Sequence, residues 1–177
     1  RMTLEDHQRQ RAFNADGYFY FLDPTKPSDQ QTAPLSDFRQ DVRSVKNLKA
    51  GQKLRCPVAL CVPKIDLLPS EPFARGSNVI DNFYEELGDI GWGMDYESID
   101  RRSYLMQRLR NDIWPNWEIE RQINDLFGGR FMFFPFTPVG LNEPGERDLK
   151  LRTISPVGIL QPLIWLLHMN GYPVLSH

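Results

Sequence analysis

A lysine and an aspartate stand two residues apart where an apolar run of the chain ends. Lys64 and Asp66 follow the segment Val58–Val62, and Pro63 separates Lys64 from this segment. Charged side chains just past a buried strand are the first candidates for chemistry, because open parallel sheets bind ligands outside the carboxyl ends of their strands. The plainer interpretation is a solvated strand end in which Asp66 caps the next turn.

Three short apolar runs are predicted to be strands, at residues 18–22, 58–62 and 131–136. Each is rich in aromatic or β-branched residues and is bounded by Gly, Pro or Asp, which is typical of strands buried on both faces. Asp23 follows the first run and Thr137 follows the third. All three strand ends therefore carry polar side chains.

An amphipathic helix is predicted between the first two strands. Its apolar positions recur at intervals of three and four: Leu35, Phe38, Val42, Val45 and Leu48. Pro34 suits the first turn of this helix and Gly51 suits its end. A strand, a helix and a strand in that order predict a parallel pair with a right-handed crossover.

The second crossover, residues 67–129, is much longer than the roughly dozen residues that a crossover requires. We expect a helical insertion at 67–116 within a single domain spanning 1–177. The pattern predicts helices near 78–87, 98–113 and 116–127. Residues 88–95 read as a flexible joint, and a last helix, apolar nearly all round, is expected to start near Pro156.

Composition limits the class of protein. The chain has 177 residues, of which 41% are hydrophobic, so it can bury a core of its own. A formal net charge of -2 indicates neither a nucleic-acid binder nor a polybasic membrane-surface protein. The apolar segment 159–169 is too short to span a bilayer. Cys56 and Cys61 are oddly spaced along an extended segment and the histidines are scattered, so we expect no local disulfide, no zinc site and a cytoplasmic location.

Two of these strand ends resemble a known family. P-loop GTPases of the Ras-like or translation-factor-like kind carry Asn-Lys-x-Asp or Thr-Lys-x-Asp after one strand and a Ser-Ala-Lys-type turn after the next. The stretches VPKID at 62–66 and FTPVG at 136–140 occupy these places in order. ADGYFYFLDPT at 15–25 is similar to the strand before the motif, and PVGILQPLIWLL at 156–167 to the final helix. Within this family, the chain also resembles bacterial proteins that carry paired GTPase-like domains.

The resemblance implies an α/β fold, with a mainly parallel sheet between flanking helices in three layers. This would be the C-terminal half of a P-loop NTPase-like fold, with inserted helices. It also implies that GTP or GDP is bound at Lys64, Asp66, Thr137, Pro138 and Val139. The carboxylate of Asp66 would accept hydrogen bonds from the N1 and N2 protons of guanine, a contact worth about 1–3 kcal/mol of discrimination. Lys64, projected the same way by an extended backbone, would lay its stem over the purine.

The chain departs from the family pattern at two prolines. Pro63 replaces the Asn or Thr that ties the motif to the phosphate loop, and it offers no N–H. Pro138 replaces an alanine whose N–H binds the guanine carbonyl, so that donor must come from Val139 or be absent. The sequence contains no G-x-x-x-x-G-K-[ST] phosphate loop. We therefore assign no catalytic or metal-binding residue, and expect GTPase activity and Mg²⁺ only together with an N-terminal phosphate-binding half.

Two functions from different classes follow. The first is the guanine-nucleotide-binding part of a GTPase-like domain. The second is a non-catalytic, degenerate G domain whose inserted helices bind a protein partner. A phosphoacceptor receiver domain using Asp23 and Lys64 is disfavoured, because no acidic pair lies on an earlier strand.

The outer edge of the strand at 18–22 is also expected to be covered. In the G-domain topology this strand pairs with the phosphate-loop strand, so its edge would otherwise stay unpaired. We expect it to be covered by another chain, by self-association or by a preceding segment, whose last helix would be residues 4–16.

Three further groupings have plain structural interpretations. The four arginines of segment 100–110 read as a solvated helix face, with docking to an acidic partner as the alternative. Trp114 and Trp117 flank a proline and are expected to pack a helix corner rather than form an exposed anchor. Glu85 and Glu86 point to different sides of a helix and are not a catalytic pair.

Overall fold

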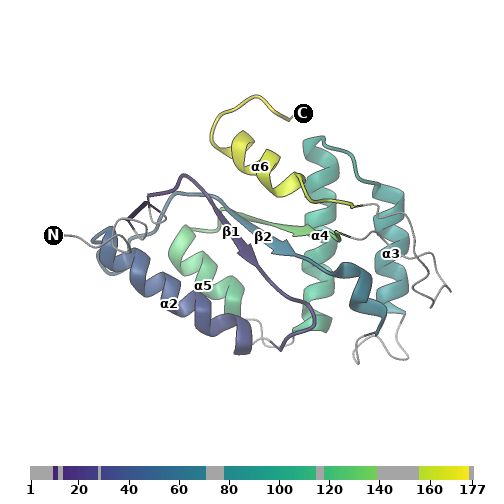
Figure 1. Cartoon of the computed structure of the whole chain (residues 1–177), viewed down its shortest axis with the longest axis horizontal. Helices are drawn as coiled ribbons and strands as arrows, with labels where there is room; N and C mark the ends of the chain where they lie inside the picture. Colours follow the sequence, from purple (N-terminus) through teal and green to yellow (C-terminus); the bar gives the residue numbers. More distant parts are fainter. Residues whose placement is uncertain are drawn as a thin grey trace.

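A computed structural model describes residues 10–11, 14–27, 29–70, 78–114, 118–138 and 156–175. At its centre lies a sheet of three parallel strands in the order β1 (Tyr18–Phe21), β2 (Val58–Val62) and β3 (Phe131–Pro135) (Figure 1). Tyr18 pairs with Val58, and Val58 with Phe131. The prediction of adjacent, parallel strands is confirmed, with β1 and β3 each one residue shorter than expected.

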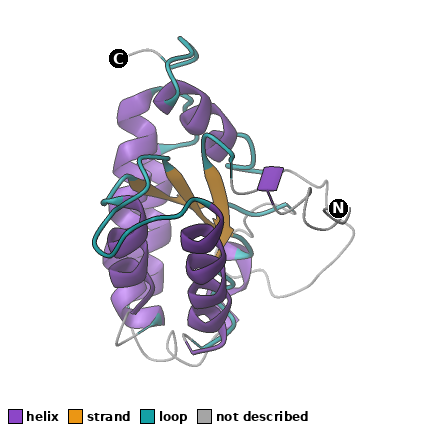
Figure 2. Cartoon of the chain, turned by 90° about the vertical axis from the view of Figure 1, so that its left-hand side faces the viewer, coloured by secondary structure: helices purple, strands orange, loops and turns teal. Residues whose placement is uncertain are grey.

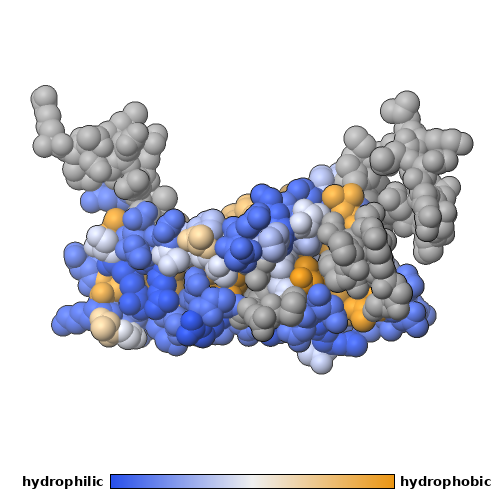
Figure 3. All heavy atoms as spheres, turned by 90° about the horizontal axis from the view of Figure 1, so that it is seen from below, coloured by the Kyte–Doolittle hydropathy of each residue, from blue (hydrophilic) through white to orange (hydrophobic). Residues whose placement is uncertain are grey.

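Helices cover both faces of the sheet (Figure 2). One face packs its alternate β2 residues, Val58, Leu60 and Val62, into a core shared with α2 (Asp29–Val45), α3 (Val79–Ile90) and α5 (Glu118–Phe127). The opposite face carries the small residues Ala59 and Cys61, which pack against α6 (Gln161–Met169). The α/β class and the layered arrangement are therefore as expected. From below, the molecule is mainly hydrophilic with small, separate hydrophobic patches (Figure 3).

The outer edge of β3 is closed by an inserted helix, α4 (Tyr96–Ile113). The Phe133 N–H, which points away from β2, donates to Oγ of Ser103 on α4 at 2.9 Å. The Phe131 N–H donates to the Gly129 carbonyl at 3.0 Å, and Pro135 has no N–H to donate. On this side of the sheet, Phe131, Phe133 and Pro135 therefore offer no free N–H group to which a further strand could pair.

The outer edge of β1 is different. Tyr18 and Leu22 donate their N–H groups to the carbonyls of Pro57, just before β2, and Cys61, within β2, so the backbone groups of Phe19 and Phe21 point the other way. In the part of the chain that the structure describes, no strand pairs with β1 on that side. The Phe19 and Phe21 residues are 46% and 62% exposed. The prediction that all three strands are buried on both faces is wrong for β1.

The first crossover helix begins and ends earlier than its pattern indicated. α2 starts at Asp29, so Pro34 lies inside the helix rather than in its first turn. It ends at Val45 because Asn47 adopts φ 48°, and the Leu48 N–H then donates to the Arg43 carbonyl at 3.0 Å. This is a Schellman-type cap with asparagine in the position that Gly51 was expected to supply.

The second crossover contains the 3₁₀ helix η1 (Ile65–Ser70), α3, α4 and α5. The three predicted helices exist, but α3 continues through Gly88 to Ile90 and α4 begins at Tyr96. The side chain of Asp95 caps α4 by accepting from the Ser98 N–H at 2.8 Å. The supposed joint at 88–95 is therefore partly helical and partly a capped turn.

The last helix, α6, starts at Gln161 rather than near Pro156. Val157 instead forms an antiparallel bridge with Thr137, and Gly158 turns the chain with φ 75°. A Cβ atom on Gly158 would lie 2.7 Å from the Pro135 carbonyl oxygen, so only glycine fits there. Within α6, Leu163 is 46% exposed, so this apolar helix is not buried all round. No helix among the described residues has the length and apolar character needed to cross a membrane.

Candidate functional site

The carboxyl ends of β1 and β2 meet through an ion pair. Nζ of Lys64, two residues past β2, lies 2.6 Å from Oδ2 of Asp23, two residues past β1. Lys64 adopts φ 61°, in the left-handed region that non-glycine residues rarely enter, and its side chain is 47% exposed. The structure thus brings together two strand-end residues that the sequence placed on separate strands.

Asp23 is held by more than the lysine. Its Oδ1 also accepts hydrogen bonds from the Thr25 N–H at 3.1 Å and the Thr25 hydroxyl at 2.7 Å. Burial raises the pKa of Asp23, but the hydrogen bonds from Lys64 and Thr25 outweigh it and lower the pKa below its ordinary value. Thr25 was missed from sequence, although an aspartate two residues before a threonine is a known turn pattern.

Asp66 lies in the first turn of η1. Its Oδ1 atom is buried and accepts no hydrogen bond from the residues that the structure describes. The expected extended segment from Lys64 to Asp66 is wrong, because the chain turns at Lys64 and its carbonyl accepts from the Leu67 N–H at 2.9 Å. The two side chains therefore do not project together by strand alternation.

Tyr84, on α3, approaches the same turn from the other side. Its hydroxyl donates to the Ile65 carbonyl. Burial, reinforced by the negative charge of Asp66, raises the pKa of Tyr84 well above its usual range. Tyr84 is a site neighbour that sequence reasoning missed, since it comes from the inserted segment and only the folded chain brings it to the strand end.

The third strand end lies against the second. The Phe136 N–H donates to the Val62 carbonyl at 3.0 Å, and the Ile65 N–H donates to the Phe136 carbonyl at 3.5 Å. Pro63 is half-buried between them. Of the predicted site residues on this end, Thr137 is buried, and its N–H donates to the Val157 carbonyl at 3.2 Å.

The remaining two predicted guanine-binding residues are Pro138 and Val139. Pro138 is exposed and has no N–H. Val139 lies outside the described residues. A main-chain donor for a guanine carbonyl is therefore not supplied by Thr137 or Pro138.

The four arginines of α4 differ in exposure, so they do not form one solvated face. Arg102 is 1% exposed and donates to the carbonyls of Gly91 and Gly93, each at 2.5 Å. Its guanidinium also lies over the ring of Trp92, 5.6 Å from the centroid. Burial lowers the pKa of Arg102 to about 10, against the opposing effect of Asp95. The prediction holds for the exposed residues Arg101 and Arg108 and is wrong for Arg102, whose hydrogen bonds hold the turn between α3 and α4 in place.

Other side chains with potential chemistry have structural roles. Arg110 pairs with Glu120, and Arg108 pairs with Glu86 at 2.8 Å. Trp114 is buried and donates to the Lys26 carbonyl at 3.0 Å, so its predicted packing role is confirmed, whereas Trp117 lies outside the described residues.

Cys56 and Cys61 are free thiols, and burial raises the pKa of Cys61 to about 12. Such a thiol is a poor nucleophile at neutral pH, because the thiolate is the reactive form. Among the described residues, no three His, Cys, Asp or Glu side chains are grouped so that they could hold a metal ion.

Comparisons of the chain with protein-family models, with curated proteins and with solved structures found no match. The function must therefore be inferred from the residues at the strand ends.

Proposed function

We propose that the carboxyl edge of the sheet binds the base of a guanine nucleotide, as part of a GTPase-like domain. The observation that carries this proposal is the buried Oδ1 of Asp66, which has no donor among the described residues. A buried carboxylate oxygen is costly to leave without a hydrogen bond. The N1 and N2 protons of guanine form the kind of paired donor that such a carboxylate accepts.

Lys64 contributes through its stem. The ammonium group stays on Asp23, while the methylene groups cover the edge of the site, where a purine ring can lie against them. This arrangement needs no extended spacing between Lys64 and Asp66. The proposal concerns base recognition, and no residue of this chain is assigned to phosphate, Mg²⁺ or hydrolysis.

The test is a titration of the isotopically labelled 177-residue chain with GDP, XDP and ADP, followed by NMR. We expect GDP, but not ADP, to shift the amide signals of residues 64–67 in a saturable way. Asp66→Asn should weaken GDP binding about tenfold or more and favour XDP, because an amide donor then faces the xanthine carbonyl. Asp81→Asn, an exposed acid on α3, is the matched control and should change neither.

Equal responses to GDP and ADP, or equal GDP binding by Asp66→Asn and wild type, would count against the proposal.

A second function, a non-catalytic interaction module derived from a G domain, is favoured by one observation. Thr137 already uses its N–H, and Pro63 and Pro138 have none to offer. A folded chain with no guanine preference would support this second function.

A further inference from the structure

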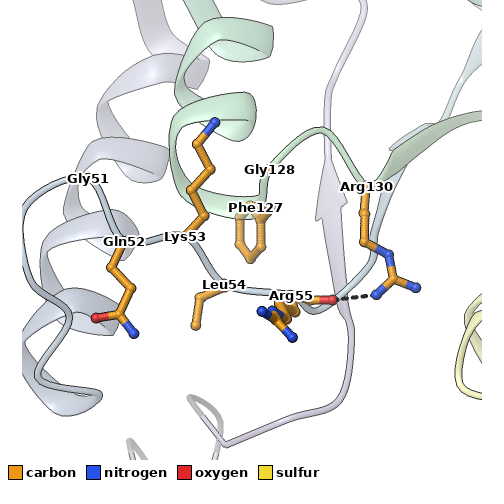
Figure 4. A pocket seen from close by; sticks show the side chains of 8 residues that line it. All are labelled: Gly51, Gln52, Lys53, Leu54, Arg55, Phe127, Gly128 and Arg130. Carbon is orange, nitrogen blue, oxygen red and sulfur yellow. Dashed lines mark hydrogen bonds between the residues drawn. The ribbon is translucent and has the colours of Figure 1, made fainter.

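A concave site lies at the end of the strands opposite to Lys64 and Asp66. The segments that lead into β2 and β3, residues 51–55 and 127–130, enclose a cavity of about 440 Å³ (Figure 4). The two segments are tied together on either side of it, by the Leu54 N–H to the Leu126 carbonyl at 2.7 Å and the Val58 N–H to the Arg130 carbonyl at 2.9 Å. The cavity is therefore preformed by the backbone.

The charge of this cavity is one-sided. Lys53, Arg55 and Arg130 line it and are exposed, and no carboxylate is among its lining residues. Within the described ranges, none of the three cations forms an ion pair. Every charged residue from position 42 to position 65 is basic, although the whole chain carries a net charge of -2. The segment that leads into β2 is thus locally basic, although Lys64 in this stretch lies at the other end of the strands.

One of the three cations has a sufficient structural explanation. The stem of Lys53 lies against Gly128, just past the end of α5, where a positive charge offsets the negative end of the helix dipole. Figure 4 shows its ammonium group on the side of α5, away from the Gln52 amide and the two guanidinium groups. Arg55 and Arg130 need a different explanation.

Arg130 is held next to the main chain of Arg55. It donates from Nη1 to the main-chain carbonyl of Arg55 at 2.7 Å, and both residues line the cavity. A guanidinium has five N–H donors, so most remain free for a ligand. Its fork matches the oxygens of a phosphate group better than any other cationic side chain does.

We propose that Arg55 and Arg130 bind the phosphate group of a small phosphorylated molecule, with Gln52 as an additional donor. The volume favours a small ligand over a polyanion, since pockets for small molecules span about 300–1,000 Å³, whereas a polyanion needs an extended basic surface. This site is independent of the proposed guanine site, which lies at the other end of the strands.

The test is a titration of the labelled chain with inorganic pyrophosphate at constant ionic strength, followed by NMR. We expect saturable shifts of the amide signals at 51–55 and 128–130, and none at 64–67. Arg55→Gln should weaken binding about tenfold, because one charged hydrogen-bonding group is lost. It leaves the Arg130 contact intact, since that contact uses the main-chain carbonyl of residue 55.

Lys49→Gln is the matched control. It removes the same charge from the same basic segment, but Lys49 does not line the cavity, so we expect less than a twofold change. Equal weakening by Arg55→Gln and Lys49→Gln would overturn the proposal, because bulk charge alone would explain binding. So would an absence of saturation, or a preference for a single-stranded oligonucleotide or for anionic phosphatidylserine vesicles over pyrophosphate.

Discussion

Arg102→Met should destabilise the protein strongly, although no functional role is assigned to this residue. The arginine is 1% exposed and makes two hydrogen bonds of 2.5 Å to the Gly91 and Gly93 carbonyls. A bond from a charged donor contributes about 1.5–3 kcal/mol. The low end of this range applies, because burial of the guanidinium is itself costly and Gln161 also reaches the Gly93 carbonyl, at 3.3 Å.

Two bonds at the low end give a loss of about 3 kcal/mol in the free energy of unfolding. For a chain of this size that corresponds to a fall in Tm of about 6–12 °C. Urea unfolding followed by circular dichroism at 222 nm would measure it. The free energy of unfolding of Arg102→Lys should lie between those of the wild type and Arg102→Met, because a lysine keeps the charge but lacks the forked guanidinium that reaches two carbonyls.

Arg101→Met is the control for this experiment. Arg101 is the neighbour of Arg102 on the same helix and is exposed, so its substitution should cost no more than about 0.5 kcal/mol. If the losses in the free energy of unfolding for Arg102→Met and Arg101→Met differed by less than about 1 kcal/mol, the stabilising role of Arg102 at this turn would be refuted.

Three other predictions concern the strand ends and edges. The pKa of Asp23 is lower in the folded state than its ordinary value of 3.8. The ionised carboxylate therefore stabilises the fold fully above pH 3.8, and this stabilisation is lost as the pH falls through the folded-state pKa. Asp23→Asn should thus reduce the free energy of unfolding more at pH 7 than at pH 3, as measured by urea titrations. An equal cost at both pH values would contradict this. Gly171→Ala should cost about 1–2 kcal/mol for its φ of 89° alone, whereas Gly158→Ala should cost about 1–3 kcal/mol more, because its Cβ would also meet the Pro135 carbonyl. Because no strand among the described residues pairs with the outer edge of β1, we expect the chain to self-associate at high concentration. Phe21→Lys should reduce this self-association in sedimentation velocity, and a monomeric wild type would be the contrary result.

The sheet could be predicted from sequence because its signal is local and redundant. A continuous apolar run such as Val58–Val62 has few stable arrangements other than a strand between two covered faces, and all five of its residues are buried. The strand–helix–strand order then fixes the parallel direction. The exposed face of β1 could not be predicted, because Phe19 and Phe21 have the same local pattern as the buried strands, and exposure depends on what lies opposite them.

Burial of polar residues was the least predictable property. Arg101 and Arg102 are adjacent and identical in type, yet one is exposed and the other is buried. What separates them is the position of the carbonyls of Gly91 and Gly93, which depends on how α3 ends. Such a contact can be found only after both helices have been placed.

At the strand ends, the sequence predicted the position of Lys64 and Asp66 in the sheet correctly but their backbone geometry wrongly. The pattern at Lys64 and Asp66 placed both at the carboxyl edge of the sheet, but it assumed an extended backbone. The left-handed turn at Lys64 is invisible in the sequence, and for a lysine it costs about 1–3 kcal/mol. The surroundings that hold it are the ion pair with Asp23 and the hydrogen bond from Leu67. This turn sends the ammonium group toward β1 and leaves the Asp66 carboxylate in η1, near α3, so a base at this edge would contact the lysine stem and the carboxylate from two different directions.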